Sequence, residues 1–361
     1  MKFDTLLKTP YTWNPDRNTT DGVVYGSIVR MVRNLPEFPF PGWSTEAHRE
    51  AVAARILPVI REIRGFKSAF YAEMNELSYG QRRALLTRKQ LTPCMAARQN
   101  GCHVIIPQKK NLFFMVNEEE HLVAHVFNNG LDFDSGLDTM AALDDWLSER
   151  LTFAYNEKDG YLTSIPSEAG DGLQLYCLLH LPGLTCANMM NQVTKALEKL
   201  HVSISPYFSD AQDDTGHLFV LFSIPGPEGS MEELQENFQD VINHLVRREQ
   251  QVRRKLQVEP GLHMQDAIGR AYGLLTNCRR ISIKELRDAI SLLRLGTLQG
   301  IICWEEGEQE MLVKLHHFAL DQATITAQAE EKGDPALCIR RAAAARDFLN
   351  NHPHYFSEIN V

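Results

Sequence analysis

The sequence predicts an α+β fold: an antiparallel sheet flanked by helices, followed by an all-helical C-terminal domain. Short apolar runs are joined too tightly for crossover helices, helical spacing recurs between other apolar runs, and everything beyond residue 260 has a helical pattern. At about 100–200 residues per domain, 361 residues fit two domains. We expect a surface segment over 1–20, a mixed domain over 21–250 and a helical domain over 251–361.

The clearest strands lie between residues 103 and 127. HVIIP (103–107), NLFFMVN (111–117) and HLVAHVF (121–127) are separated by three residues each. Connections this short join antiparallel strands, because a parallel pair needs a crossover of a dozen or more residues. Further strands are expected at VVYGSIV (23–29), LQLYCLLHL (173–181), VSISPYF (202–208) and HLFVLFSI (217–224).

Helical spacing marks residues 44–88, 138–151 and 188–200. A break at Pro225–Gly229 precedes Ser230 and Glu233, which fit a capping box at the start of a long helix. Its near-heptad apolar residues are typical of a core-packing helix, and a dimer seam is the alternative. A second box, Ser282 with Glu285, opens a helix that we expect Gly296 to close.

The composition excludes several classes of protein. With 44% hydrophobic residues the chain is not a disordered one, and its net charge of −9 makes it a poor general binder of nucleic acid or anionic membrane. Seven cysteines without a CxxC pair favour reduced thiols and a cytoplasmic location. His316-His317 and His352 with His354 lack partners at metal-ligand spacing, so we expect surface histidines and no metal site.

The acidic triplet Glu118-Glu119-Glu120 stands between two strands, next to His121. Carboxylates at the mouth of a sheet can hold a guanidinium through charged hydrogen bonds and take a proton from it. A solvated turn is the simpler interpretation of three acids between strands.

Four stretches in the same order resemble motifs of the ATP:guanido phosphotransferases, the phosphagen-kinase family. In chain order they are GSIVRMVRNLPEFPFP, VNEEEHL, GYLTSIPSEAGDGLQLYCLLHLP and IGRAYGLLTNCRRISIKELRDAISLLRLG. The last stretch is similar to the bacterial protein-arginine kinase branch. The resemblance covers roughly residues 20–350. It implies a guanido-kinase (glutamine-synthetase-like) sheet domain and a C-terminal domain used in dimerisation and phosphoarginine recognition.

The resemblance also implies site residues. Glu118 and Glu119 match the catalytic carboxylates of the family's NEEDH string, with Glu119 as the general base, and His121 and the His180-Leu181-Pro182 turn are kept. The family's reactive cysteine falls on Ile165, and a further family glutamate falls on Ser209. Five positions match nucleotide-binding arginines; they are Ile28, Arg30, Val123, Gln174 and Ile204.

Only Arg30 of those five positions is an arginine. Holding a triphosphate with Mg²⁺ needs a group of permanent cations, and losing one such donor commonly lowers a rate by about 10²–10³. We therefore predict a pseudokinase that acts as a protein-binding adaptor or scaffold. The alternative is an active protein arginine kinase, using ATP and Mg²⁺ with Glu119 as general base.

A second alternative is a phosphoarginine reader. LCIRRAAAAR (337–346) resembles the R-D-x-x-R-A motif that binds phosphoarginine in the kinase branch, and Arg341 matches its second arginine. The resemblance further implies a homodimer, a small zinc-binding activator and a Clp-type chaperone as partners.

Overall fold

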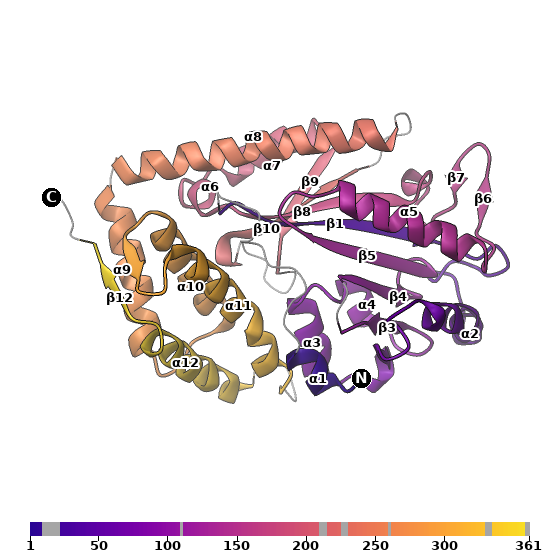
Figure 1. Cartoon of the computed structure of the whole chain (residues 1–361), viewed down its shortest axis with the longest axis horizontal. Helices are drawn as coiled ribbons and strands as arrows, with labels where there is room; N and C mark the ends of the chain where they lie inside the picture. The colour runs from indigo at the N-terminus through magenta and orange to yellow at the C-terminus, as the bar shows by residue number, and fades with distance from the viewer. Residues whose placement is uncertain are drawn as a thin grey trace.

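The computed structural model describes residues 1–8, 22–108, 111–208, 215–224, 230–258, 261–328 and 334–357. Within them the chain builds an eight-stranded sheet of order β2-β3-β4-β5-β1-β8-β10-β9 with antiparallel neighbours (Figure 1). The strands are β1 (Val24–Arg33), β2 (Phe70–Glu73), β3 (His103–Ile106), β4 (Leu112–Val116), β5 (Leu122–Asn129), β8 (Leu173–His180), β9 (Val202–Pro206) and β10 (Leu218–Ser223). A separate small hairpin pairs β6 (Tyr155–Asn156) with β7 (Gly160–Tyr161).

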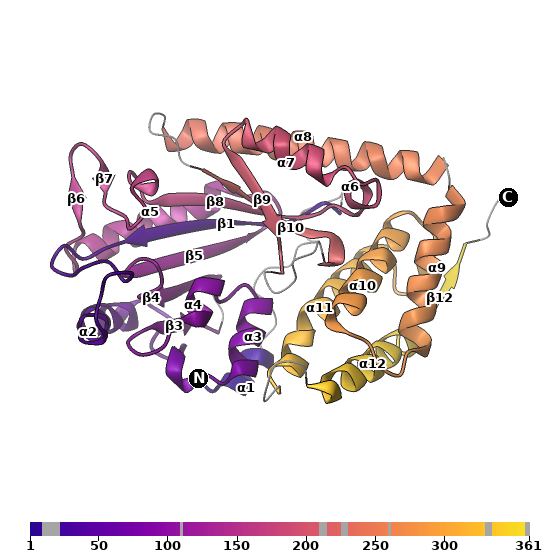
Figure 2. The same ribbon diagram turned by 180° about the vertical axis from the view of Figure 1, so that it is seen from behind.

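Helices cover both faces of this sheet. One face packs against α2 (Glu46–Glu62), α5 (Asp134–Ser148), α7 (Met190–Glu198) and the long α8 (Met231–Val258). The other face packs against α1 (Phe3–Lys8), α3 (Tyr79–Thr87) and α4 (Pro93–Ala97), which lie below the sheet in Figure 1 and are seen from behind in Figure 2. The arrangement confirms the predicted antiparallel sheet flanked by helices.

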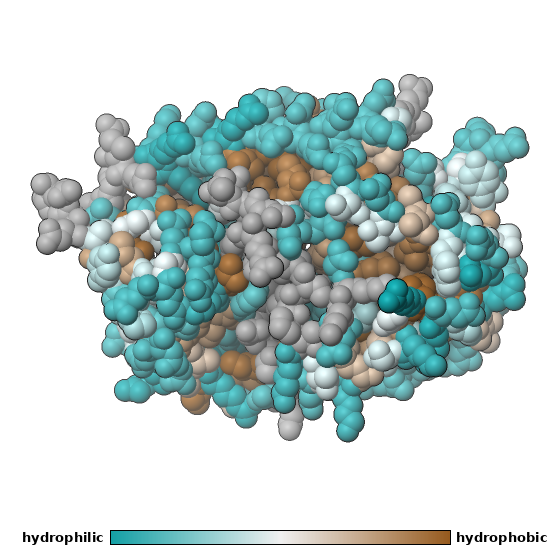
Figure 3. Space-filling view, viewed as in Figure 1, coloured by the Kyte–Doolittle hydropathy of each residue, from teal (hydrophilic) through white to brown (hydrophobic). Residues whose placement is uncertain are grey.

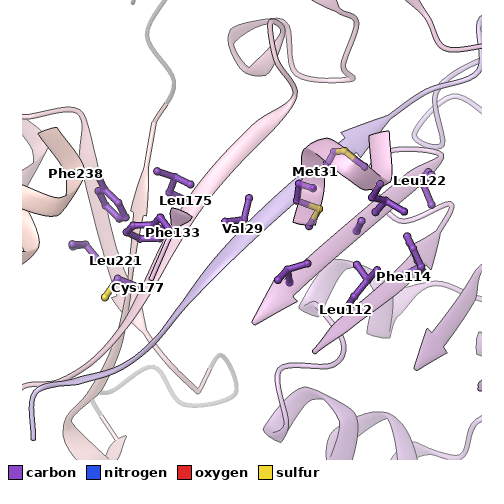
Figure 4. Packing of buried hydrophobic residues seen from close by; sticks show 14 of the residues in the cluster. Val29, Met31, Leu112, Phe114, Leu122, Phe133, Leu175, Cys177, Leu221 and Phe238 are labelled. Carbon is purple, nitrogen blue, oxygen red and sulfur yellow. The ribbon is translucent and has the colours of Figure 1, made fainter. Parts of the chain in front are cut away.

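The core of the α8-covered face is continuous across the sheet. Figure 4 shows Phe133 and Phe238 beside Leu175 at one end, and Leu112, Phe114 and Leu122 at the other. Val29 and Met31 of β1 lie between these two groups. Strand β1 is buried along its whole length. It therefore holds in fixed positions the side chains that point to the other face of the sheet, away from α8.

The long helix after residue 230 forms as predicted, and its capping box is present, with Ser230 and Glu233 bonded to each other's backbone N–H. Its apolar residues Phe238, Ile242 and Leu245 are buried in the sheet-domain core. Core packing therefore explains the heptad-like pattern without a dimer seam. In Figure 3 apolar residues are visible below this helix, whose outward surface is hydrophilic.

The C-terminal domain consists of α9 (Gly261–Asn277), α10 (Ile283–Leu298), α11 (Glu308–Thr326) and α12 (Pro335–Asn350). It is not all-helical, because β11 (Ile302–Trp304) pairs with β12 (His354–Phe356). The expected end of a helix at Gly296 is also wrong. Gly296 lies inside α10, where a Cβ would stand 2.8 Å from Cγ2 of Ile268, so this glycine allows α10 to approach α9.

The N-terminal end of the chain departs from the expected surface segment over 1–20. Residues 3–8 form α1, with Phe3, Leu6 and Leu7 buried against the sheet domain, and residues 9–21 lie outside the described part. The predicted helical stretch 44–88 contains strand β2 as well as two helices.

None of the helices in the described ranges combines the length and the apolar character needed to cross a bilayer.

Candidate functional site

A row of polar side chains crosses the three central strands. Arg30 of β1 pairs with His125 of β5 on one side and with Gln174 of β8 on the other. Cross-strand partners point to the same face of a sheet, so the three side chains share one face, called the Arg30 face below. The Arg30 guanidinium donates from Nη1 to Oε1 of Gln174 at 2.7 Å, and the Tyr176 hydroxyl donates to the same oxygen at 2.9 Å.

The neighbouring positions on the Arg30 face are apolar. Ile28 and Val123, which match two nucleotide-binding arginines, are 6% and 0% exposed and belong to the buried cluster that includes α1 and α3. Ile204, the third apolar match, pairs with Leu221 and packs into the core of the opposite face. The structure therefore brings Ile28, Arg30, Val123 and Gln174 together and separates Ile204 from them.

The acidic triplet follows strand β4 in a tight turn. The turn begins at Asn117, whose φ of 60° is one that asparagine tolerates better than most residues. The Asn117 amide donates to the carbonyl oxygens of Arg49 and Gly101, at 2.8 and 2.6 Å. These bonds fix the turn. The three carboxylates that follow Asn117 point from the turn into different environments.

Glu118 is buried and points to the Arg30 face. Its carboxylate accepts from the Thr92 hydroxyl and from the backbone N–H of Glu119, and it lies 3.7 Å from Nη2 of Arg30. Its carbonyl oxygen accepts from Arg98 at 2.8 Å. Glu118 and Arg30, two retained matches to the family pattern, are therefore an ion pair.

Glu119 is the exposed member of the triplet. Partial burial of its carboxylate and the neighbouring Glu118 raise its pKa, against the lowering effect of Arg30. A carboxylate at the rim with a raised pKa is suited to take a proton from a nearby group.

Glu120 joins two loops of the site. Its carboxylate accepts from both the N–H and the hydroxyl of Ser164, at 2.8 and 2.7 Å, and from the Asn34 amide at 2.6 Å. Burial raises its pKa in spite of these bonds. Ile165, the residue after Ser164, is 39% exposed. The position matched to the reactive cysteine therefore presents an alkyl side chain at the rim of the site.

His121 is a structural residue. Its Nδ1 accepts from the N–H of Leu35 at 3.1 Å, and its Nε2 lies 3.0 Å from the carbonyl oxygen of Pro39. Burial lowers its pKa, so the ring is neutral and fully occupied in holding the 35–44 loop. His180 is also structural, because its Nε2 lies 2.7 Å from the Ser291 hydroxyl of α10, between the sheet domain and the C-terminal domain.

The sequence reasoning missed Glu168, which lies 3.9 Å from Nη1 of Arg30, with its side chain 24% exposed. It also missed His125, which packs edge-on against Phe113 and whose pKa is lowered to about 3 by burial and then by Arg30. The β-strand alternation could have placed His125 beside Arg30. Nothing in the sequence pattern indicated Glu168, because it belongs to a short 3₁₀ turn, Pro166–Glu168.

The Arg30 charge is balanced by acids. Burial lowers its pKa, but Tyr176, Glu118, Glu168 and Glu120 outweigh burial, and the net pKa is raised. Arg30 is thus a permanent cation whose partners belong to the chain itself.

The remaining predicted residues lie elsewhere. Arg341 of α12 is buried, with Nη2 3.4 Å from the Thr326 hydroxyl, whereas Arg340 bonds Gln328 and Arg346 bonds the Cys278 carbonyl. Ser209 lies outside the described residues. His316, expected on the surface, is buried beside the Tyr25 ring. No group of three or more potential metal ligands occurs among the residues with described coordinates.

Comparison with known proteins agrees with this architecture. Residues 52–252 match the family model "ATP:guanido phosphotransferase, C-terminal catalytic domain", and residues 261–357 match "Protein-arginine kinase McsB C-terminal domain". The protein-arginine kinase of Shouchella clausii is 27% identical over 354 residues, 97% of this chain and 98% of that one. The protein-arginine kinase of Halothermothrix orenii is 27% identical over 299 residues, 83% and 85% of the two chains.

Solved structures show the same fold. The duplicated taurocyamine kinase of Schistosoma mansoni superposes with a TM-score of 0.58 at 18% identity, over 74% of this chain and 39% of that duplicated chain. A lombricine kinase superposes with a TM-score of 0.54 at 18% identity, over 67% and 69% of the two chains. The chain belongs to the ATP:guanido phosphotransferase family, in its bacterial protein-arginine kinase branch.

Proposed function

We propose that this chain is a kinase-fold adaptor or scaffold with little or no phosphoryl-transfer activity. The supporting observation is the state of the Arg30 face. Two positions matched to nucleotide-binding arginines are buried aliphatic residues, and a third is Gln174, which accepts a hydrogen bond from the remaining arginine.

The residues present do not fit a polyphosphate. A triphosphate needs several cations that are free to meet its oxygens. Here Arg30 lies within 4 Å of two carboxylates, at 3.7 Å from Glu118 and 3.9 Å from Glu168. Bringing a polyanion there would break these contacts and place phosphate oxygens next to carboxylates and alkyl groups, so neither ATP nor its Mg²⁺ would be held well.

An active protein arginine kinase is the second candidate, and the names of the related proteins favour it. Glu119 supports it too, since an exposed carboxylate with a raised pKa suits a general base acting on a guanidinium. In that case Arg30 would be the phosphate contact and ATP with Mg²⁺ the phosphoryl donor.

One assay separates the two candidates. The chain is incubated with γ-labelled ATP, Mg²⁺ and an arginine-rich protein, and acid-labile label on arginine is scored beside the Glu119→Gln variant. We expect wild type and variant to give the same background. Label that depends on Glu119 would overturn the adaptor proposal and establish the kinase.

The partners proposed by family resemblance are a second copy of this chain, a small zinc-binding activator and a Clp-type chaperone. The dimer is tested by light scattering on the purified chain, for which a monomer mass at all concentrations would remove it. Phosphoarginine reading is tested with Arg341→Ala and a phosphoarginine peptide, and unchanged affinity would exclude a role for Arg341.

A further inference from the structure

The missing arginines are only part of what separates the Arg30 face from a polyphosphate site. Gln174 gives Arg30 a carbonyl oxygen at 2.7 Å, the separation that a phosphate oxygen would also adopt. The Tyr176 hydroxyl donates to the same oxygen at 2.9 Å, which holds the amide with its oxygen toward the guanidinium. Arg30 therefore has an internal acceptor in place of a ligand oxygen.

Glu168 supplies the second internal partner. It comes from the loop that Glu120 ties to the sheet through Ser164, so its position near Arg30 is supported by two partly buried hydrogen bonds. This loop therefore places a carboxylate 3.9 Å from the Arg30 guanidinium.

The resulting charge favours cations over anions. Among the described residues, Glu119 and the three carboxylates that act on it or on Arg30, which are those of Glu118, Glu120 and Glu168, supply four negative charges, while Arg30 and Arg98 supply two guanidiniums, a formal sum of −2. Like charges a few ångströms apart repel, so each carboxylate beside Arg30 weakens the binding of a polyanion there.

We propose that Gln174 and Glu168 are specificity-determining residues that exclude polyphosphate from the Arg30 face by serving as its internal acceptor and internal anion. The proposal rests on the proposed function and deepens it, because it assigns the rejection of nucleotide to two named side chains. It also implies that the rejection is reversible by substitution.

The test measures gain of binding. Inorganic tripolyphosphate and ATP–Mg²⁺ are titrated by calorimetry into wild type, Glu168→Gln, and the double variant Glu168→Gln with Gln174→Arg. We expect the Glu168→Gln variant to bind tripolyphosphate at least fivefold more tightly than wild type, and the double variant at least tenfold more tightly. The reason is the loss of one repelling charge and then the gain of one cation.

Matched controls carry the same changes in net charge away from the site. Glu157→Gln in the β6–β7 hairpin matches the single variant, and Glu157→Gln combined with Gln192→Arg on α7 matches the double variant; both positions are exposed. If the site variants bind no better than their controls, the inference is wrong. Because Gln174 is buried, folding of the double variant is checked by thermal melting, and the Glu168→Gln variant alone decides the outcome if the double variant is unfolded.

Failure of this inference is distinguishable from failure of the proposed function. If neither wild type nor the folded variants bind tripolyphosphate or ATP–Mg²⁺, only the roles of Gln174 and Glu168 are overturned. Tight saturable binding of ATP–Mg²⁺ by wild type itself overturns the proposed function, and with it this inference.

Discussion

The carboxylate of Glu120 is the best test of the site at the level of one residue. It is 1% exposed and accepts from three donors, two on Ser164 and one on Asn34. Replacing Glu120 with alanine removes the acceptor of these donors at a buried position. We expect Glu120→Ala to lower the free energy of unfolding by about 2–4 kcal/mol, measured by urea denaturation.

Two further variants make the Glu120 prediction specific. Glu120→Gln keeps one carbonyl oxygen, which can still accept from Ser164, and should show an intermediate loss. Glu157→Ala removes an exposed carboxylate and should stay within about 0.5 kcal/mol of wild type. Equal stability of Glu120→Ala and wild type would mean that these bonds do not hold the loop.

At this scale the sequence indicated part of the site. The resemblance located Arg30, Glu118 and Glu119, and the structure places them together. It could not show that Arg30 is engaged by Glu118 and Glu168, because ion pairs depend on tertiary distances rather than on motif identity. Nor could it show that Ile204 lies on the opposite face; because side chains alternate along β9, its neighbours Ser203 and Ser205 share the Arg30 face instead.

Two glycines test the packing of helices in the C-terminal domain. A Cβ at Gly296 would stand 2.8 Å from Ile268, whereas a Cβ at Gly273 of α9 would meet no neighbouring atom within 4 Å. Gly296→Ala should therefore lower the melting temperature, with a loss of about 1–3 kcal/mol from overpacking. Gly273→Ala should be neutral or stabilising by up to about 1 kcal/mol, because alanine favours the helix.

The same change of residue type thus has opposite expected signs at two helical positions. If both variants melt alike, the close approach of α9 and α10 is wrong. The sequence pattern predicted a helix end at Gly296 because glycine is frequent at helix C-termini. Only the contact with Ile268 shows that this glycine allows two helices to pack closely.

Elements with a clear sequence pattern were predictable. The meander of β3, β4 and β5 follows from apolar runs joined by three-residue connections, and the long α8 follows from helical spacing. Strands β2, β11 and β12 have four or three residues each, and none of them is joined to its partner strand by such a short connection. They exist because a neighbouring strand pairs with them, which is a tertiary effect.

For the whole molecule, buried histidines predict acid sensitivity. Burial, and then Arg30, lower the pKa of His125 to about 3, while burial and then Arg294 hold the pKa values of His180 and His316 well below the ordinary value. Unfolded histidine titrates near 6.5, so below that pH the unfolded state binds more protons than the folded state. Stability should therefore be full above about pH 6.5 and fall on acidification, by about 1.4 kcal/mol per pH unit for each such histidine.

The variant His125→Phe isolates one of these contributions. Between pH 7.5 and 5.5 it should lose about 1.4 kcal/mol less than wild type in urea denaturation, since one titrating group is gone. His244→Phe replaces an exposed histidine of α8 and should keep the wild-type loss. A parallel pH profile for wild type and His125→Phe would contradict this, because it would mean that His125 takes up its proton equally in the folded and the unfolded protein.

The proposed function requires that the Arg30 face of this guanido-kinase sheet does not hold the phosphates of a nucleotide. Calorimetric titration of the wild-type chain with ATP–Mg²⁺ tests it most directly. We expect no saturable heat up to millimolar nucleotide. One-to-one binding with a micromolar dissociation constant would contradict it.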